Sequence, residues 1–310
     1  MKRVLLIRFS ALGDVAMTVP VVRTAAEQHP DVSFHMLSQA RMEGLFASMP
    51  ANVRFIGVDL KRQSLKEITQ NLGTYEMVAD LHGVWRSRYV RHLLRLRGAR
   101  VRSIRKGRFS KWLLTHGWIH RPLKPTATRY AEVLTRLGIS VTLPPMQVKE
   151  IGQGIGIAPF AAHIGKIYPL DRMEQVVRLL SQKGERVILF GRGEQEEAVL
   201  SAWATKYPHV ESVAGLYNLE EELQLMKGLR VMISMDSANM HLASLVGTRV
   251  VSIWGATHPN TGFMGYGQAK CDCVQRDLNC RPCSVYGNKK CKYGDYRCLA
   301  MTPEEIVAHC

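Results

Sequence analysis

The chain has 310 residues, and its hydrophobic share of 46% and charged share of 22% are those of an ordinary globular protein. A chain of this length usually exceeds what one core serves, so two domains are expected. No apolar run reaches the roughly 18–20 residues of a membrane span. Met1-Lys2-Arg3 leads into a short apolar run without the pattern of a signal peptide, which predicts a cytoplasmic protein.

The first 145 residues alternate between strand-like and helix-like segments. Short apolar or β-branched runs predict strands at Val4–Ile7, Ser33–Leu37, Val53–Ile56, Met77–Leu81 and Val101–Ile104. Helical patterns between them include Met17–Glu27 and Tyr89–Leu96. This alternation predicts βαβ units and a parallel sheet.

A basic block lies in the same half of the chain. Residues 86–129 hold fourteen Lys or Arg and no Asp or Glu, in a chain whose net charge is +16. Such a block can bind a nucleic-acid backbone, an anionic membrane surface or a phosphorylated substrate, or it can be a solvated surface. The length of the all-positive stretch favours an anionic partner.

The segment "TLPPMQVKEIGQG", residues 142–154, predicts a linker because a Pro pair and a Gly cluster interrupt both periodicities. The alternation then restarts, with strands expected at Gly156–Pro159, Arg186–Phe190, Val231–Ser234 and Val250–Trp254, and helices at Leu170–Gln182, Glu194–Lys206, Leu219–Lys227 and Ala238–Val246. We therefore expect an α/β fold with two Rossmann-like domains facing a cleft, residues 1–148 and 149–310.

All seven cysteines follow residue 270, and six of them lie in a Cys-rich segment that spans residues 271–298. Within it, "CRPCSVYGNKKCKYGDYRC" contains Cys280, Cys283, Cys291 and Cys298. In a reducing cytoplasm such clustering favours metal ligation over disulfides, but the second half lacks the tight cysteine pair of a typical zinc site. A structural zinc, two disulfides and free thiols all stay open.

Two loops of the second half have the composition of an anion site. "FAAHIGKIYP", residues 160–169, offers backbone amides and Lys166 to a phosphate. "ISMDSANMHLASLVG" places Asp236 and Ser237 at a helix start and His241 about one turn later. Ordinary helix capping and an interior histidine are the alternatives. The chain has no Walker pattern and no GxGxxG, which argues against ATPases and dinucleotide enzymes.

Two further residues could contact a nucleoside. Glu194 follows a Gly turn and could bind a ribose hydroxyl, or it could simply favour a helix start. Tyr217 precedes a helix, where its ring could flank an adenine or pack into the core.

The stretch "RFSALGDVAMTVP", residues 8–20, follows the first predicted strand and carries Asp14. A carboxylate there can stabilise a helix N-terminus through the macrodipole. It can also act as a base, because ligands in parallel α/β sheets collect at the carboxyl ends of strands. Position alone does not decide between these roles.

These stretches resemble those of one enzyme family along nearly the whole chain. The segments are "RFSALGD" at 8–14 with Pro20 after it, "VADLHGVWRSRYVRHL" at 78–93, "DSANMH" at 236–241 and "WGATHP" at 254–259. In this order they are similar to the signatures of the ADP-heptose:lipopolysaccharide heptosyltransferases, glycosyltransferase family 9. Ala161-Ala162 stands where the family often has Thr-Thr, Ala238 replaces a Gly, and His82 replaces a Gln.

The resemblance implies a GT-B fold and inverting transfer of heptose from ADP-heptose to a hydroxyl of a lipopolysaccharide inner-core acceptor, similar to lipid A–Kdo. It implies an acceptor-binding first domain, a nucleotide-sugar-binding second domain, and Asp14 as general base. Together with the loops above, the expected donor-binding residues are Ala161, Ala162, Lys166, Glu194, Tyr217, Asp236, Ser237, Ala238 and His241. The expected acceptor-binding residues are Ser10, Gly13, Lys61, Arg62, Asp80, His82 and Arg86.

Catalysis without a metal ion is expected, because the chain has no Asp-x-Asp motif. The basic block would contact the phosphates of an anionic lipid A-core acceptor, with the protein peripheral at the inner face of the inner membrane.

Two alternatives remain: another nucleotide-sugar enzyme, such as an epimerase, and a nucleic-acid-binding protein that uses residues 86–129. The second lacks aromatic residues interleaved on a sheet face and the spacing of a helix-turn-helix or a zinc finger, so no nucleic-acid partner is expected.

Overall fold

The computed structural model describes residues 2–145, 148 and 152–310. The chain forms two compact units: unit 1 contains Met1–Lys106 and Pro125–Pro145, and unit 2 contains Gly107–Lys124 and Met146–Cys310. Residues 146–147 and 149–151 of the linker predicted over 142–154 lie outside the described residues, and the domain boundary predicted after residue 148 falls among them.

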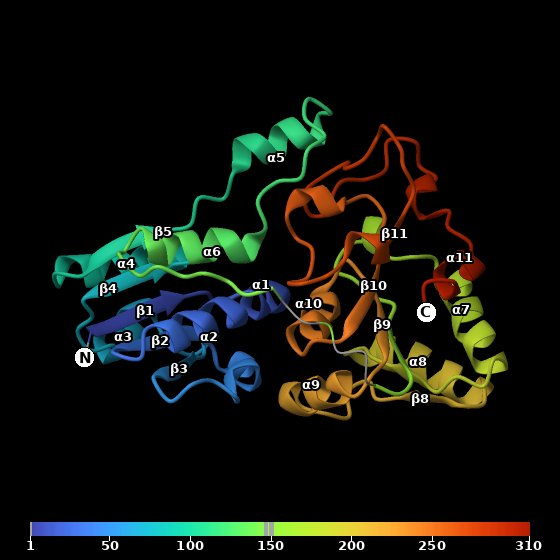
Figure 1. Cartoon of the computed structure of the whole chain (residues 1–310), viewed down its shortest axis with the longest axis horizontal. Coiled ribbons are helices and arrows are strands. Elements are labelled where there is room, and N and C mark those ends of the chain that lie inside the picture. Colours follow the sequence, from blue (N-terminus) through green and yellow to red (C-terminus); the bar gives the residue numbers. More distant parts are fainter. Residues whose placement is uncertain (1, 146–147, 149–151) are drawn as a thin grey trace. The chain divides into compact units, whose positions relative to one another are not determined.

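Unit 1 is built on a parallel sheet of five strands in the order β3-β2-β1-β4-β5 (Figure 1). The strands are β1 (Lys2–Ile7), β2 (Val32–Gln39), β3 (Val53–Val58), β4 (Met77–Asp80) and β5 (Arg100–Ser103). Its α-helices are α1 (Leu12–Ala16), α2 (Val19–Gln28), α3 (Leu65–Asn71), α4 (Trp85–Leu96) and α6 (Thr126–Thr135), and a 3₁₀ helix covers Ala40–Phe46.

The core of unit 1 lies where helices cover the central strands. Val4–Ile7 of β1 is buried throughout, as expected for a parallel strand covered on both faces. Leu5, Ile7 and Val78 form one cluster with Val90 and Leu94 of α4. The apolar run of β1 therefore fixes it as the central strand.

Unit 2 is built on a parallel sheet of six strands in the order β11-β10-β9-β6-β7-β8. The strands are β6 (Ile155–Ala158), β7 (Val187–Leu189), β8 (Val210–Ser212), β9 (Val231–Met235), β10 (Arg249–Trp254) and β11 (Cys273–Gln275). The α-helices are α5 (Arg108–Thr115), α7 (Leu170–Gln182), α8 (Glu194–Lys206), α9 (Leu219–Lys227), α10 (Ala238–Leu245) and α11 (Pro303–Val307). Its core joins Ile157, Ile233 and Ile253 to Val176 and Leu180 of α7.

Each sheet has one point where the strand order reverses direction. In unit 1 this point lies between β1 and β4, and in unit 2 it lies between β6 and β9. A crevice outside the carboxyl ends of such a strand pair is where open α/β sheets bind ligands. The segments that leave these four strands are therefore the first places to look for a site.

The expected α/β class and the parallel sheets are confirmed. The predicted helices at 170–182, 194–206 and 219–227 coincide with α7, α8 and α9. Sequence analysis did not single out α3, α5, α6 or α11.

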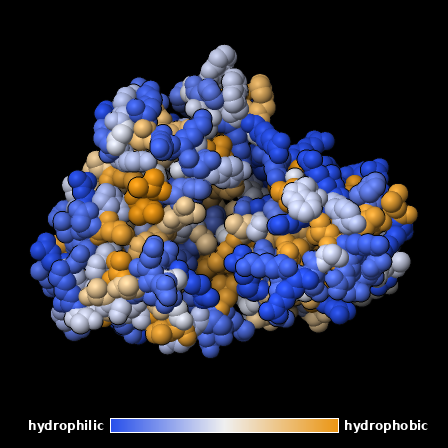
Figure 2. Space-filling view, turned by 180° about the vertical axis from the view of Figure 1, so that it is seen from behind, coloured by the Kyte–Doolittle hydropathy of each residue, from blue (hydrophilic) through white to orange (hydrophobic). Residues whose placement is uncertain are grey.

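In the described part of the chain, no helix combines the length and the hydropathy that crossing a membrane requires. On the face drawn in Figure 2, hydrophilic side chains separate smaller hydrophobic patches.

Candidate active site

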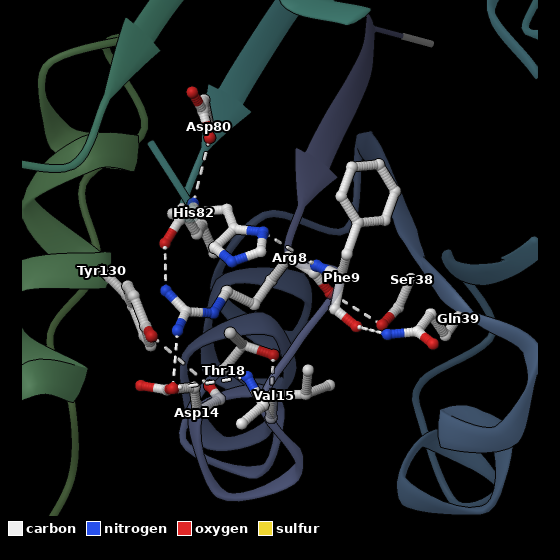
Figure 3. Close-up of polar contacts among 12 residues, drawn as sticks. Arg8, Phe9, Asp14, Val15, Thr18, Ser38, Gln39, Asp80, His82 and Tyr130 are labelled. Atoms are coloured by element: carbon white, nitrogen blue, oxygen red, sulfur yellow. Dashed lines mark hydrogen bonds and ion pairs between the residues drawn. The ribbon is translucent and has the colours of Figure 1, made fainter. Parts of the chain in front are cut away.

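The segment after β1 holds an ion pair between Arg8 and Asp14 (Figure 3). Arg8 Nη2 lies 2.7 Å from Asp14 Oδ2, and the two side chains are 9% and 28% exposed. Arg8 Nη1 donates to the carbonyl of Leu81 after β4, at 2.9 Å, and the guanidinium carbon lies 5.9 Å from the centre of the Tyr130 ring. Arg8 therefore connects the ends of both strands at the reversal point to Asp14.

The carboxylate of Asp14 keeps one oxygen for other partners. Its contacts with the Arg8 guanidinium and with the backbone N–H of Ala11, at 3.4 Å, are both made by Oδ2. Asp14 is the third residue of α1, and the Tyr130 hydroxyl donates to its backbone carbonyl at 3.4 Å. The side chain is thus held from one side while Oδ1 can accept the proton of a hydroxyl.

Asp80, at the end of β4, is a structural carboxylate. It is fully buried, and its Oδ1 accepts from the backbone N–H groups of His82 and Gly83, at 3.0 and 2.8 Å. Its Oδ2 accepts from Arg91 at 3.0 Å and from Ser103 at 3.3 Å. Since both oxygens are engaged, Asp80 shapes the turn after β4, where Gly83 has a φ of 62°.

His82 lies next to this turn with a defined orientation. Its Nδ1 accepts from the backbone N–H of Phe9 at 3.4 Å, so Nε2 carries the proton of the neutral ring. Burial, together with the nearby charges of Arg8 and Lys106, lowers the pKa of His82 to about 4. At neutral pH the ring is uncharged and can donate one hydrogen bond.

His82 should make the protein less stable in acid. Between pH 6.5 and 4 the unfolded chain binds a proton that the folded His82 does not, so stability falls as the pH falls through this window. The contribution is at most about 3.5 kcal/mol, at about 1.4 kcal/mol per pKa unit. We expect His82→Gln to lose less stability than the wild type between pH 7 and pH 4.5 in urea titrations. Equal losses in the two proteins would contradict this assignment.

The other expected acceptor residues are spread over unit 1. Ser10 and Gly13 lie in the segment that carries Asp14, and Arg86 lies on α4 with its guanidinium 5.2 Å from the Trp85 ring. Lys61 and Arg62 follow β3, where both contact Asp59. β3 is two strands from β1 in the sheet, so Lys61 and Arg62 follow a strand that is not at the reversal point.

In unit 2, the segments after β6 and β9 meet in a second ion pair. Lys166 Nζ lies 3.0 Å from Asp236 Oδ2, and the side chains are 15% and 8% exposed. The hydroxyl of Thr257, after β10, donates to the same oxygen at 2.8 Å. A lysine ammonium has three donors, so Lys166 can still donate to anionic oxygens. Asp236 fixes the position of that positive charge.

The loop that carries Lys166 is held by a close backbone approach. The N–H of Ala256 donates to the carbonyl of Gly165 at 2.7 Å, and a Cβ at position 165 would lie 2.9 Å from the Cβ of Ala256. Glycine at 165 therefore permits the approach that places Lys166 beside Asp236.

The remaining expected donor residues lie at the same edge of the sheet. Ser237 is the N-cap residue of α10 without a capping hydrogen bond, Ala238 is its first residue, and His241 is buried on the same helix. Ala161 and Ala162 precede Lys166 in its loop. Glu194 begins α8, and the carbonyl of Tyr217 accepts from Arg192 at 2.9 Å, which joins the segments after β7 and β8.

Sequence analysis missed Arg281, which braces the segment after β10. Its guanidinium donates to the carbonyls of Trp254, Gly255 and Thr257 at 3.0, 2.6 and 2.8 Å, and also to the carbonyl of Arg276. Burial lowers the pKa of Arg281. Thr257 in turn donates to Asp236, so Arg281 supports the ion pair of unit 2 from behind. No motif in the sequence around Arg281 indicates this role.

Replacing Arg281 should therefore affect both stability and nucleotide binding. In Arg281→Lys one ammonium cannot serve four carbonyls, and each buried carbonyl left unpaired costs about 1–3 kcal/mol. We expect a loss of at least about 2 kcal/mol in unfolding free energy and weaker ADP binding by calorimetry. Arg297→Lys, at an exposed ion pair with Asp295, is the matched control and should change neither. An unchanged unfolding free energy in Arg281→Lys would show that Arg281 does not support the segment after β10.

The four clustered cysteines lie within electrostatic range of one another. All seven cysteines are free thiols, so of the alternatives left open the structure shows free thiols and not two disulfides. The Cys283 thiol donates to the Cys280 carbonyl at 3.2 Å, and the Cys291 thiol faces Asp295 at 4.0 Å. Burial raises the pKa of Cys298 to about 11. Among the described residues no group of three or more His, Cys, Asp or Glu side chains is arranged to hold a metal ion, so the predicted zinc site finds no support.

Comparison with known proteins shows which family the chain belongs to. The family model for glycosyltransferase family 9 (heptosyltransferase) matches residues 126–294, more than half of the chain. The chain belongs to glycosyltransferase family 9. This family model covers Lys166, Asp236 and Arg281, whereas Asp14 lies outside it.

Two curated relatives and one solved structure extend the similarity beyond the family model. Lipopolysaccharide heptosyltransferase 3 of Escherichia coli is 24% identical over 79% of this chain and 81% of its own length. Lipopolysaccharide heptosyltransferase 1 of Pseudomonas aeruginosa is 25% identical over 94% of this chain and 88% of its own length. The structure of E. coli heptosyltransferase WaaC with ADP is 20% identical, with a TM-score of 0.70 over 98% of this chain and 97% of that one. The expected GT-B fold is confirmed.

Proposed function

We propose that this family 9 enzyme transfers heptose from ADP-heptose to a hydroxyl of a lipopolysaccharide inner-core acceptor with inversion. The observation that carries the proposal is the pairing of each candidate site with a strand-order reversal, Arg8–Asp14 in unit 1 and Lys166–Asp236 in unit 2. The relatives are named as lipopolysaccharide heptosyltransferases, and WaaC is seen with ADP.

In this proposal Asp14 is the general base. The acceptor hydroxyl attacks the anomeric carbon, its proton passes to Asp14 Oδ1, and the bond from that carbon to the diphosphate oxygen breaks. General-base assistance of this kind is worth roughly 10²–10⁴-fold in rate. Arg8 holds Oδ2, and the neutral His82 can donate from Nε2 to an acceptor oxygen.

Unit 2 would hold the donor. Negative charge grows on the departing ADP, and Lys166 and the backbone N–H groups at the start of α10 would stabilise it. A preorganised donor in a dry site contributes about 2.7–4 kcal/mol to the transition state. Ala161, Ala162, Glu194, Tyr217, Ser237, Ala238 and His241 would line the rest of the donor site. No catalytic metal is part of this proposal, so activity should persist in EDTA.

Transfer of labelled heptose from ADP-heptose to a core acceptor tests the proposal. Labelled acceptor supports it, whereas release of an altered free sugar would favour a nucleotide-sugar epimerase. A thermal-shift screen of ADP-, UDP-, GDP- and CMP-sugars tests the donor separately, because a ligand of the folded state raises its apparent stability. A shift with a UDP- or GDP-sugar but not with ADP-heptose would refute the choice of donor.

The proposal includes peripheral contact with the anionic inner face of the inner membrane, where such an acceptor would lie. Part of the basic block has internal partners: Arg91 pairs with Asp80, Arg97 donates to the carbonyls of Thr69 and Leu72, and Arg129 donates to the carbonyl of Lys106. Only part of the block is therefore available to phosphates. A nucleic-acid partner is not part of the proposal, and filter binding with a salt titration would reveal one.

A further inference from the structure

Helix α5 and the turn after it carry three large aromatic side chains that touch one another and are exposed. Phe109, Trp112 and Trp118 are 71%, 47% and 72% exposed. The rings of Phe109 and Trp112 are stacked at 6.1 Å with 16° between their planes, and the centres of Trp112 and Trp118 are also 6.1 Å apart. Single exposed apolar residues are common, but a contiguous group of large ones marks an interaction surface. We call these three residues the α5 aromatic patch.

The patch is not the consequence of a loose segment. Leu114 of α5 is buried, and Lys111 Nζ lies 4.0 Å from the centre of the Phe263 ring within unit 2. After the helix, Asn260 donates to the carbonyl of His120 at 2.8 Å, and the N–H of Leu123 donates to the carbonyl of Asn260 at 2.8 Å. Unit 2 thus holds one side of the segment while the aromatic side chains stay exposed.

The charges around the α5 aromatic patch indicate the chemistry of its partner. Residues 107–124 contain Arg108, Lys111, Arg121 and Lys124 and no Asp or Glu. Aromatic residues beside basic ones favour the headgroup level of an anionic bilayer, where indole rings are enriched. Single-stranded nucleic acid also binds aromatic and basic surfaces, but it needs open ring faces for base stacking. Here neighbouring ring centres lie only 6.1 Å apart in one contiguous patch, an arrangement that suits a layer of rings among lipid headgroups better than a row of separate platforms for successive bases.

We infer that the α5 aromatic patch seats unit 2 on an anionic lipid bilayer, with the rings among the headgroups and the basic side chains against lipid phosphates. This inference rests on the proposed function for the choice of a membrane, and it gives the proposed membrane contact a definite surface.

Vesicle co-sedimentation of the full chain tests the inference. The probes are vesicles of phosphatidylglycerol and phosphatidylcholine at 1:1, and vesicles of phosphatidylcholine alone. We expect the wild type to bind the anionic vesicles, and the variant Phe109→Ser/Trp112→Ser/Trp118→Ser to bind them at least tenfold more weakly with an unchanged melting temperature. The control Trp85→Ser/Tyr89→Ser removes two exposed aromatic residues of α4 and should keep most of the binding.

Bromolipid quenching reports whether the rings themselves enter the headgroup region. Trp203 and Trp254 are buried, so in Trp85→Phe the exposed indoles are those of Trp112 and Trp118. We expect brominated phosphatidylglycerol vesicles to quench this variant, and the quenching to disappear when Trp112→Phe and Trp118→Phe are added. Binding without quenching would overturn insertion of the rings.

The remaining outcomes separate this inference from the proposed function. Equal binding of the wild type and the triple variant, equal loss in the α4 control, or preference for a single-stranded oligonucleotide over vesicles would overturn docking through α5. Transfer to a deacylated, water-soluble acceptor should be unchanged in the triple variant. If the wild type fails to transfer heptose even to that acceptor, the proposed function fails instead.

Discussion

Asp14→Asn should leave folding intact and lower turnover at least a hundredfold. An amide oxygen can still accept from Arg8, so the contact between Arg8 and residue 14 persists. An amide cannot take the proton of the acceptor hydroxyl, and loss of a general base costs roughly 10²–10⁴-fold. The measurement is ADP release with acceptor in excess, together with the affinity for ADP by calorimetry, which should change little.

Asp31→Asn is the matched control for this substitution. Asp31 is an exposed carboxylate of unit 1 at the amino end of β2, whereas the candidate site lies at the carboxyl ends of the strands. Its replacement should leave turnover unchanged. If the Asp14 variant retained more than a tenth of the wild-type rate, Asp14 would not be the base.

Lys166→Met should weaken ADP binding by about 10–100-fold, since a hydrogen bond to a charged group contributes about 1.5–3 kcal/mol. It should also destabilise the protein by about 3–5 kcal/mol, because the buried Asp236 carboxylate loses its ammonium partner and keeps the Thr257 hydroxyl. Isothermal calorimetry and thermal melting measure the two effects.

Two further variants separate binding from stability. Lys166→Met with Asp236→Asn removes the uncompensated charge, so it should recover stability while ADP binding stays weak. Lys183→Met, on an exposed lysine after α7, should change neither property. Recovery of ADP affinity in the double variant would show that Lys166 acts only through folding.

The helices that sequence predicted best have strong end signals and a conventional apolar face. α9 begins after Asn218, whose side chain accepts from Glu220 and Glu221, and α7 packs Val176 and Leu180 into the core. α5 was missed for a physical reason. Its aromatic residues are exposed and do not pack into a core, so the spacing of its apolar residues does not indicate a helix with one buried face. The strands β8 and β11, three residues each, are too short for an apolar pattern to register.

For the candidate site, sequence reasoning could find groups that lie close to a strand end in a distinctive segment. Asp14, Lys166 and Asp236 are of this kind. The residues that hold them in place were not found, because their contacts join parts of the chain far apart in sequence. Arg8 reaches the carbonyl of Leu81, and Arg281 reaches that of Trp254. α3 and α11 could have been predicted, since both begin with a capping box, at Ser64 with Glu67 and at Thr302 with Glu305.

The way the chain is shared between the two units has a consequence for dissecting the enzyme. Residues 107–124 belong to unit 2, whereas the residues before and after them belong to unit 1. A fragment ended at Pro145 would carry α5 without Phe263 and Asn260, and the complementary fragment would lack α5. Neither fragment would then contain one complete unit. A split version of the enzyme, or a chimera with a relative, therefore needs three junctions, near residues 106, 124 and 145.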